Sequence, residues 1–163
     1  MNRKDLNILT KEIVEDCVDK KYNLQNLLYI SVNLNEESSD KLKDLFINNN
    51  PWGDDKTRII CHHMTMAFRN FLTDKVLEWA ILNDGKVESL KVVSYGWSDK
   101  AFAVAVETDV PSTNKIKHVT CAININNGGK PVDSNLITNW VSVDEVFDIN
   151  GVVTFNYKKE RGV

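Results

Sequence analysis

The sequence lacks long hydrophobic runs and has few cysteines. No apolar run approaches the roughly 18 residues that would span a bilayer, and no apolar segment follows the N-terminus, so we expect neither a membrane span nor a signal peptide. The three cysteines are odd in number and form no CxxC pair. This usage favours free thiols in a reducing cytoplasm over a disulfide framework.

An excess of positive charge is also missing. The formal net charge is −3 over 163 residues, which argues against a sequence-independent binder of long nucleic acid. It leaves room for a small phosphorylated ligand in a local pocket. With 42% apolar and 26% charged residues, the chain has the composition of a soluble globular protein. Its length fits one domain, or two small lobes that share a core.

Several familiar site motifs are absent. The sequence contains no GxxxxGK[ST], GxGxxG or GxSxG string. Side chains that bind metals in other proteins occur in two places, which are Cys61, His62 and His63, and His118 and Cys121. Adjacent residues on a strand point to opposite faces, however, and no spacing here matches a zinc pattern. We therefore expect no metal and no cofactor.

The apolar patterns predict an α+β protein. Hydrophobic residues at helical spacing indicate helices at about 4–20, after a cap at Ser38 or Ser39, and after a cap at Thr73. Apolar and alternating runs indicate strands at 27–34, 58–68, 87–97, 101–107, 116–125, 140–149 and 152–157. Hairpin turns are predicted at 98–100 and at Asn150-Gly151. The partly repeated order of these elements favours two mixed α+β lobes within a single domain over 1–163.

The main functional signal lies in two short strings, His63-Met64-Thr65 and His118-Val119-Thr120. Each falls in a predicted strand, where residues two positions apart point to the same face. Each histidine therefore projects together with its threonine, while the residue between them faces the core. Two imidazoles and two hydroxyls that face one cleft suit acid–base chemistry on a phosphodiester.

His62 has the opposite strand phase to His63. We expect it on the apolar face with Met64, partly buried and hydrogen-bonded, and without a catalytic role. A β-bulge in this strand would exchange the roles of the two adjacent histidines.

At these strings the sequence resembles the two-histidine (2H) phosphoesterase superfamily, whose signature is a pair of His-x-Thr/Ser strands. Within it, the sequence is most similar to phage nucleases that destroy the cyclic nucleotides of CBASS, a bacterial antiphage defence. The strings that carry this resemblance are LLYISVNLNEESSDKL, IICHHMTMAF, SYGWSDKAFAVAV and NKIKHVTCAIN.

The resemblance implies a bilobal fold of two antiparallel sheet lobes with flanking helices and a central cleft. It implies metal-independent cleavage of 3′–5′ bonds in cyclic di- or trinucleotides, with attack by the ribose 2′-OH and a linear 3′-phosphate product. Catalytic roles fall on His63, Thr65, His118 and Thr120. The histidine that acts as the base and the one that acts as the acid stay open.

Further roles follow from the same resemblance. Tyr29 and Trp97 would contact the bases, and Glu145 would hydrogen-bond a base edge. The protein would act in the cytoplasm of the infected bacterial host, with neither long nucleic acid nor a membrane as partner. Two other functions fit the motifs: a protein that binds cyclic nucleotides without cutting them, and a 2H enzyme that opens 2′,3′-cyclic phosphates on RNA.

Overall fold

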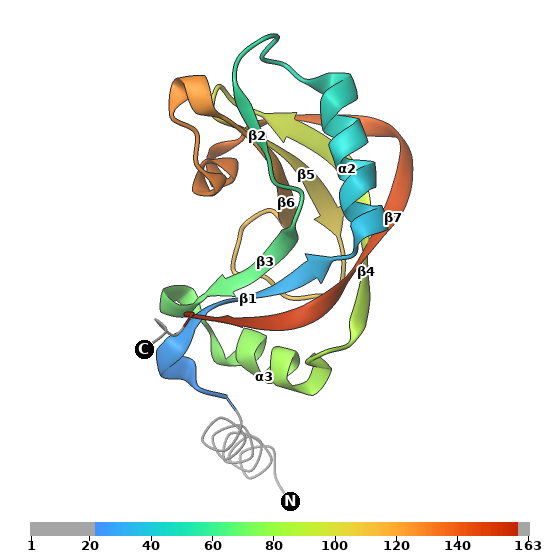
Figure 1. Ribbon diagram of the computed structural model, residues 1–163. Helices are drawn as coiled ribbons and strands as arrows, with labels where there is room; N and C mark the ends of the chain where they lie inside the picture. The colour runs from blue at the N-terminus through green and yellow to red at the C-terminus, as the bar shows by residue number, and fades with distance from the viewer. Residues whose placement is uncertain (1–21, 160–163) are drawn as a thin grey trace, which may run out of the picture.

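Strands dominate the computed structural model, which describes residues 22–159 (Figure 1). Its α-helices are α2 (Glu36–Asn49) and α3 (Asp74–Asn83). Its strands are β1 (Leu27–Leu34), β2 (Thr57–Ile59), β3 (His63–Phe68), β4 (Val87–Trp97), β5 (Ala101–Glu107), β6 (His118–Asn124) and β7 (Asn139–Tyr157). Short 3₁₀ helices are η1 (Leu24–Asn26), η2 (Arg69–Phe71), η3 (Ile125–Asn127) and η4 (Pro131–Leu136). The helix predicted at about 4–20 lies outside the described residues.

The strands form one antiparallel sheet that closes on itself. The strand order is β2-β6-β3-β1-β7-β4-β5, and β6 also pairs with β5, so six strands complete a barrel with β2 beside β6. The predicted α+β class is confirmed. The strands form one continuous sheet, where the sequence led us to expect two lobes within a single domain. Closure makes the two histidine strands, β3 and β6, immediate neighbours.

Every strand of the barrel contributes to one main core. Residues on one face of the sheet are fully buried, and they pack with apolar side chains of α2 and α3. Met64 and Val119, the central residues of the two strings, both have no exposed surface and belong to this core. The alternation of apolar and polar residues therefore assigned the core face of both histidine strands correctly.

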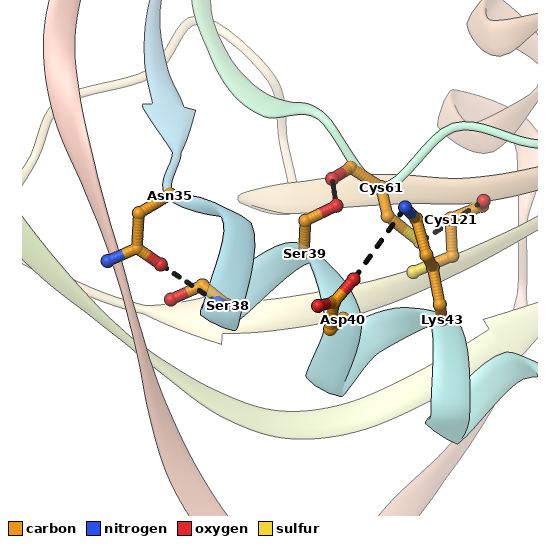
Figure 2. A network of polar contacts seen from close by, with 7 residues as sticks. All are labelled: Asn35, Ser38, Ser39, Asp40, Lys43, Cys61 and Cys121. Carbon is orange, nitrogen blue, oxygen red and sulfur yellow. Dashed lines mark hydrogen bonds and ion pairs between the residues drawn. The ribbon is translucent and has the colours of Figure 1, made fainter.

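The two described α-helices begin at side-chain caps. Thr73 accepts a hydrogen bond from the Val76 amide, which confirms the predicted cap of α3. The cap predicted at Ser38 or Ser39 is wrong, because Asn35 accepts from the Ser38 amide and α2 starts at Glu36 (Figure 2). Both serines bind other segments instead: the Ser38 hydroxyl accepts from the Asn150 amide of β7, and Ser39 donates to the Cys61 carbonyl between β2 and β3.

The hairpin predicted at Asn150-Gly151 is also wrong. β7 is one strand of 19 residues that runs through this dipeptide and curves along the barrel (Figure 1). Gly151 pairs with Leu34 of β1, and a Cβ atom at Gly151 would lie 2.5 Å from the Asn33 carbonyl oxygen. The glycine therefore permits a close approach of the two backbones, which is one of the known reasons for a glycine inside a strand.

The first histidine strand is interrupted, where the sequence predicted one continuous strand over 58–68. β2 and β3 are separated by residues 60–62, and Cys61 has a φ of +49°. The hairpin of β4 and β5 around 98–100, by contrast, is confirmed. Within residues 22–159, no helix is long and apolar enough to cross a membrane.

Candidate functional site

Four polar side chains from the two strings lie on one face of neighbouring strands. Met64 and Val119 are paired across β3 and β6, and both face the core. Side chains alternate between faces, so the residues that flank this pair project from the opposite face. These residues are His63, Thr65, His118 and Thr120.

The antiparallel direction of β3 and β6 arranges these four residues as a square. It brings His63 towards Thr120, and Thr65 towards His118. The two histidines thus occupy diagonal positions, for which Cβ atoms lie roughly 7–8 Å apart. The proximity of His118 contributes to a lowered pKa of His63. This spacing leaves room for a phosphoryl group between the two rings.

Small side chains extend this face beyond β6. Ala103 pairs with Thr120 and Ala105 with His118, and both alanines are buried. Trp140 and Ile137 pack against Ala103, so the segment from η4 to the start of β7 forms a wall beside the histidines. Because these alanine side chains are small, they occupy little of the space between the sheet and that wall.

The ring of His118 is held by the main chain. Its Nδ1 lies 2.7 Å from the Ile116 carbonyl oxygen, which can only accept, so Nδ1 carries the proton. The other ring nitrogen, Nε2, is left to exchange a proton. Burial lowers the pKa of His118, and the hydrogen bond to Ile116 acts in the opposite direction because it stabilises the imidazolium.

The ring of His63 has a different environment. Tyr29 stacks on it with ring centroids 5.0 Å apart, so the predicted substrate contact Tyr29 lies directly beside a candidate catalytic group. The Nδ1 atoms of His63 and His62 are 2.9 Å apart. Burial, followed by the positive charges of His62 and His118 when protonated, lowers the pKa of His63 to about 4. His63 is therefore neutral at pH 7 in the free protein.

The expected hydrogen bond of His62 is confirmed, but its expected burial was wrong. Its side chain is exposed and contacts His63, whereas the strand phase predicted a partly buried ring on the face of Met64. The cause is the left-handed backbone of Cys61, which interrupts the regular alternation just before β3.

The two threonines also differ in their surroundings. The Thr120 hydroxyl lies 2.8 Å from the hydroxyl of Ser134, a buried residue of η4. The side chain of Thr65 has no hydrogen bond within residues 22–159, while its carbonyl accepts from Ser112. The Ser112 contact ties the loop 111–117 to β3, next to His118. Sequence reasoning missed Ser134, because no local pattern brings η4 to β6.

A pocket of about 540 Å³ opens beside His118. The loop that precedes β6, the segment from η4 to β7, and His118 itself form its walls. Its lining residues are Thr113, Asn114, Lys115, Ile116, His118, Ser134, Asn135, Ile137, Thr138 and Trp140. The pocket offers amide, hydroxyl and ammonium groups around an aromatic ring, and its volume falls within the range of small-molecule sites.

The other two predicted substrate contacts, Trp97 and Glu145, lie on β4 and β7. Trp97 pairs with the fully buried Phe102 and packs against the main core, on the face opposite to the four polar residues. Glu145 is exposed in a bulge at 143–146, between residues of β7 that pair with β4. Trp140, which sequence reasoning did not select, is the tryptophan that lines the pocket.

The cysteines near the strings belong to the core. Cys61 and Cys121 are fully buried free thiols, and each sulfur contacts a main-chain carbonyl. Across the part of the chain that the structure describes, no group of three or more His, Cys, Asp and Glu side chains is placed to hold a metal ion.

Comparison with protein-family models and with curated proteins found no match to this sequence. By its fold and its site, the protein is an α+β antiparallel barrel that carries two His-x-Thr pairs side by side.

Proposed function

We propose that the protein is a metal-independent phosphodiesterase of the 2H type, which cleaves 3′–5′ bonds in cyclic di- or trinucleotides. The observation that carries this proposal is the pairing of Met64 with Val119, because it places both histidines and both threonines on one face of the sheet. Two diagonal imidazoles supply an acid and a base on either side of a phosphoryl group. The ribose 2′-OH is an internal nucleophile that is already positioned.

The reaction begins when one histidine removes the proton of the 2′-OH. The 2′-oxygen attacks the adjacent phosphorus, the bond from phosphorus to the 5′-oxygen breaks, and the second histidine protonates the departing 5′-oxygen. This step gives a linear product with a 2′,3′-cyclic phosphate. Water then opens the cyclic phosphate to a 3′-phosphate, with the two histidines in exchanged roles.

We assign the base to His63 and the acid to His118. His63 has a pKa of about 4 in the free protein, so its ring is unprotonated at pH 7. The Ile116 carbonyl stabilises the imidazolium form of His118. Burial lowers the pKa of His118 in the free protein, and the negative charge of a bound phosphodiester would act in the opposite direction, so that the substrate itself favours protonation of the acid.

Thr65 and Thr120 would donate hydrogen bonds to the phosphoryl oxygens as charge develops there. The pocket beside His118 would hold a nucleoside next to the cleaved phosphate, with Trp140 as a stacking surface and Lys115 close to phosphate charge. Tyr29 would contact the base on the side of His63.

The biological setting of the proposal follows from the resemblance to phage nucleases directed against CBASS. Cleavage of cyclic oligonucleotides in the cytoplasm of an infected bacterium would remove the signal that activates this defence. Neither long nucleic acid nor a membrane is required as a partner.

The test is an assay of the purified full chain against a panel of 3′,3′-cyclic dinucleotides and cyclic trinucleotides, with and without EDTA. We expect chelator-resistant turnover to linear products that end in a 2′,3′-cyclic phosphate and then a 3′-phosphate. Recovery of intact ligand from the heat-denatured complex would support the binding protein instead. Turnover only of RNA 2′,3′-cyclic phosphates would support the other 2H activity.

A further inference from the structure

We propose that His62 is a positioning residue for His63: it holds the ring in one tautomer and connects its protonation to the solvent. The inference rests on the proposed function for its kinetic consequence only. Its structural basis is the 2.9 Å contact between the Nδ1 atoms of the two rings, which meet edge to face.

Such a contact requires an unusual backbone. On a regular strand, adjacent side chains point to opposite faces, and their rings do not meet. Here the residue before His62 has a φ of +49°, a conformation that residues other than glycine rarely adopt. An unusual backbone conformation of this kind, at a candidate site, is a reason to look for a function.

The surrounding structure holds this conformation on several sides. The Cys61 amide donates to the Thr120 carbonyl, and the Cys61 carbonyl accepts from the Ser39 hydroxyl of α2 (Figure 2). The His62 carbonyl accepts from the Leu34 amide at the end of β1. Two strands of the barrel, β6 and β1, and the helix α2 thus fix the segment that places the His62 ring against His63.

The contact has a defined chemical consequence. Between two imidazole nitrogens, one must donate and the other accept. When His62 donates, the Nδ1 of His63 accepts, and the proton of a neutral His63 is on Nε2. When His63 donates, its Nε2 carries the lone pair that a general base needs. The tautomer of His63 is therefore coupled to that of its neighbour, as in other sites where a second group orients a catalytic imidazole.

The partners of the two catalytic rings differ in one respect. His118 donates to a main-chain carbonyl, which does not titrate near neutral pH. His63 contacts an imidazole that is exposed to solvent. The other groups that face His63 are Tyr29, whose pKa is raised by burial, and His118. Of these groups, His62 is the exposed one and provides the route for protons between His63 and solvent.

The test combines histidine NMR with kinetics on the full chain. The sequence has three histidines, so the ring nitrogen signals are few and are assigned with single variants. His62→Asn keeps a hydrogen-bonding group near the Nδ1 of His63 but removes the titratable charge. His62→Phe keeps a ring and removes both.

In both variants we expect the pKa of His63 to rise, because a positive neighbour is lost. Only His62→Phe should change the balance of Nδ1 and Nε2 protonation on the neutral His63 ring. On a cyclic dinucleotide, His62→Phe should lower kcat about tenfold with KM unchanged, and His62→Asn should restore kcat to within about twofold.

Identical His63 ring shifts and pKa in the wild type and in His62→Phe would overturn the inference, whatever the activity. Normal ring shifts in a protein that cleaves no cyclic nucleotide would instead count against the proposed function. An equal loss of kcat in both variants would contradict the positioning role, because the hydrogen bond retained by asparagine would then have no effect.

Discussion

The two His-x-Thr strings have the same spacing but different environments. On β6, His118 is buried, its Nδ1 is bound to a main-chain carbonyl, and Thr120 is bound to Ser134. On β3, the ring of His63 lies between Tyr29 and an exposed histidine, and its threonine has no side-chain partner within residues 22–159. The difference teaches that two strings with the same motif do not form two equivalent halves of the site, one on β3 and one on β6. On β6, hydrogen bonds to neighbouring groups fix both side chains. On β3, the protonation of His63 and the hydrogen bonds of Thr65 are free to change when a ligand binds.

The largest effect is expected when either of the two histidines is replaced. His63→Ala and His118→Ala should each lower kcat on cyclic dinucleotides by about 10²–10⁴-fold, because general acid–base catalysis contributes that much. Thr57→Ala, a change on β2 outside the site, is the matched control and should keep activity. Circular dichroism checks that the variants fold. Undiminished turnover in either histidine variant would defeat the mechanism.

The threonines separate a catalytic contribution from a structural one. Thr65→Val and Thr120→Val should each reduce kcat by roughly 10²-fold through loss of a phosphoryl contact. Thr120→Val should also destabilise the fold by about 1–3 kcal/mol, because it leaves the buried Ser134 hydroxyl without its partner. Thr65→Val should leave the free energy of unfolding unchanged in urea titrations. Equal destabilisation by both variants would contradict the difference that the structure shows between the hydrogen bonds of Thr120 and Thr65.

Stability against pH tests the environment of His63. Its pKa is about 4 in the folded protein and 6.5 in the reference state, so the unfolded chain binds the proton first as pH falls. The contribution of this group is therefore fully present above pH 6.5 and is lost between pH 6.5 and about 4. We expect up to roughly 3 kcal/mol of stability to be lost over this window.

His63→Asn removes this titration. Urea unfolding of the wild type and of this variant, at pH 7.5 and at pH 4.5, measures the difference. If both proteins lose the same stability on acidification, His63 is not the group responsible.

The smallest effect concerns the two tryptophans. Trp140→Leu should raise KM by roughly tenfold, because stacking on a base is worth about 1–3 kcal/mol. Trp97→Leu, the matched change on the core face, should lower the melting temperature and leave KM unchanged. A rise in KM confined to Trp97→Leu would show that bases bind on the other side of the sheet.

Local patterns predicted a large part of the fold. β1 and the β4–β5 hairpin followed from apolar runs and turn residues, and the Thr73 cap followed from a short-range hydrogen bond. The failures occurred where a residue with a strong local tendency meets a distant partner. Asn150-Gly151 is favourable for a turn, yet Gly151 is used for contact with β1, more than a hundred residues away in the chain.

The candidate site shows the same limit. Strand phase placed each histidine with its threonine, but it placed the ring of His62 wrongly because it contains no information on the left-handed backbone at Cys61. Trp140 was not selected for a related reason: the pocket that it lines forms where η4 lies beside His118.

The sequence by itself determined which side of each histidine strand faces the core, because a strand alternates with period two and apolar side chains must leave water. Only the tertiary structure decided that β3 and β6 lie side by side in register, and which groups surround each ring. Strand pairing depends on the closure of the whole barrel, in which β3 and β6 are joined to partners far apart in the chain.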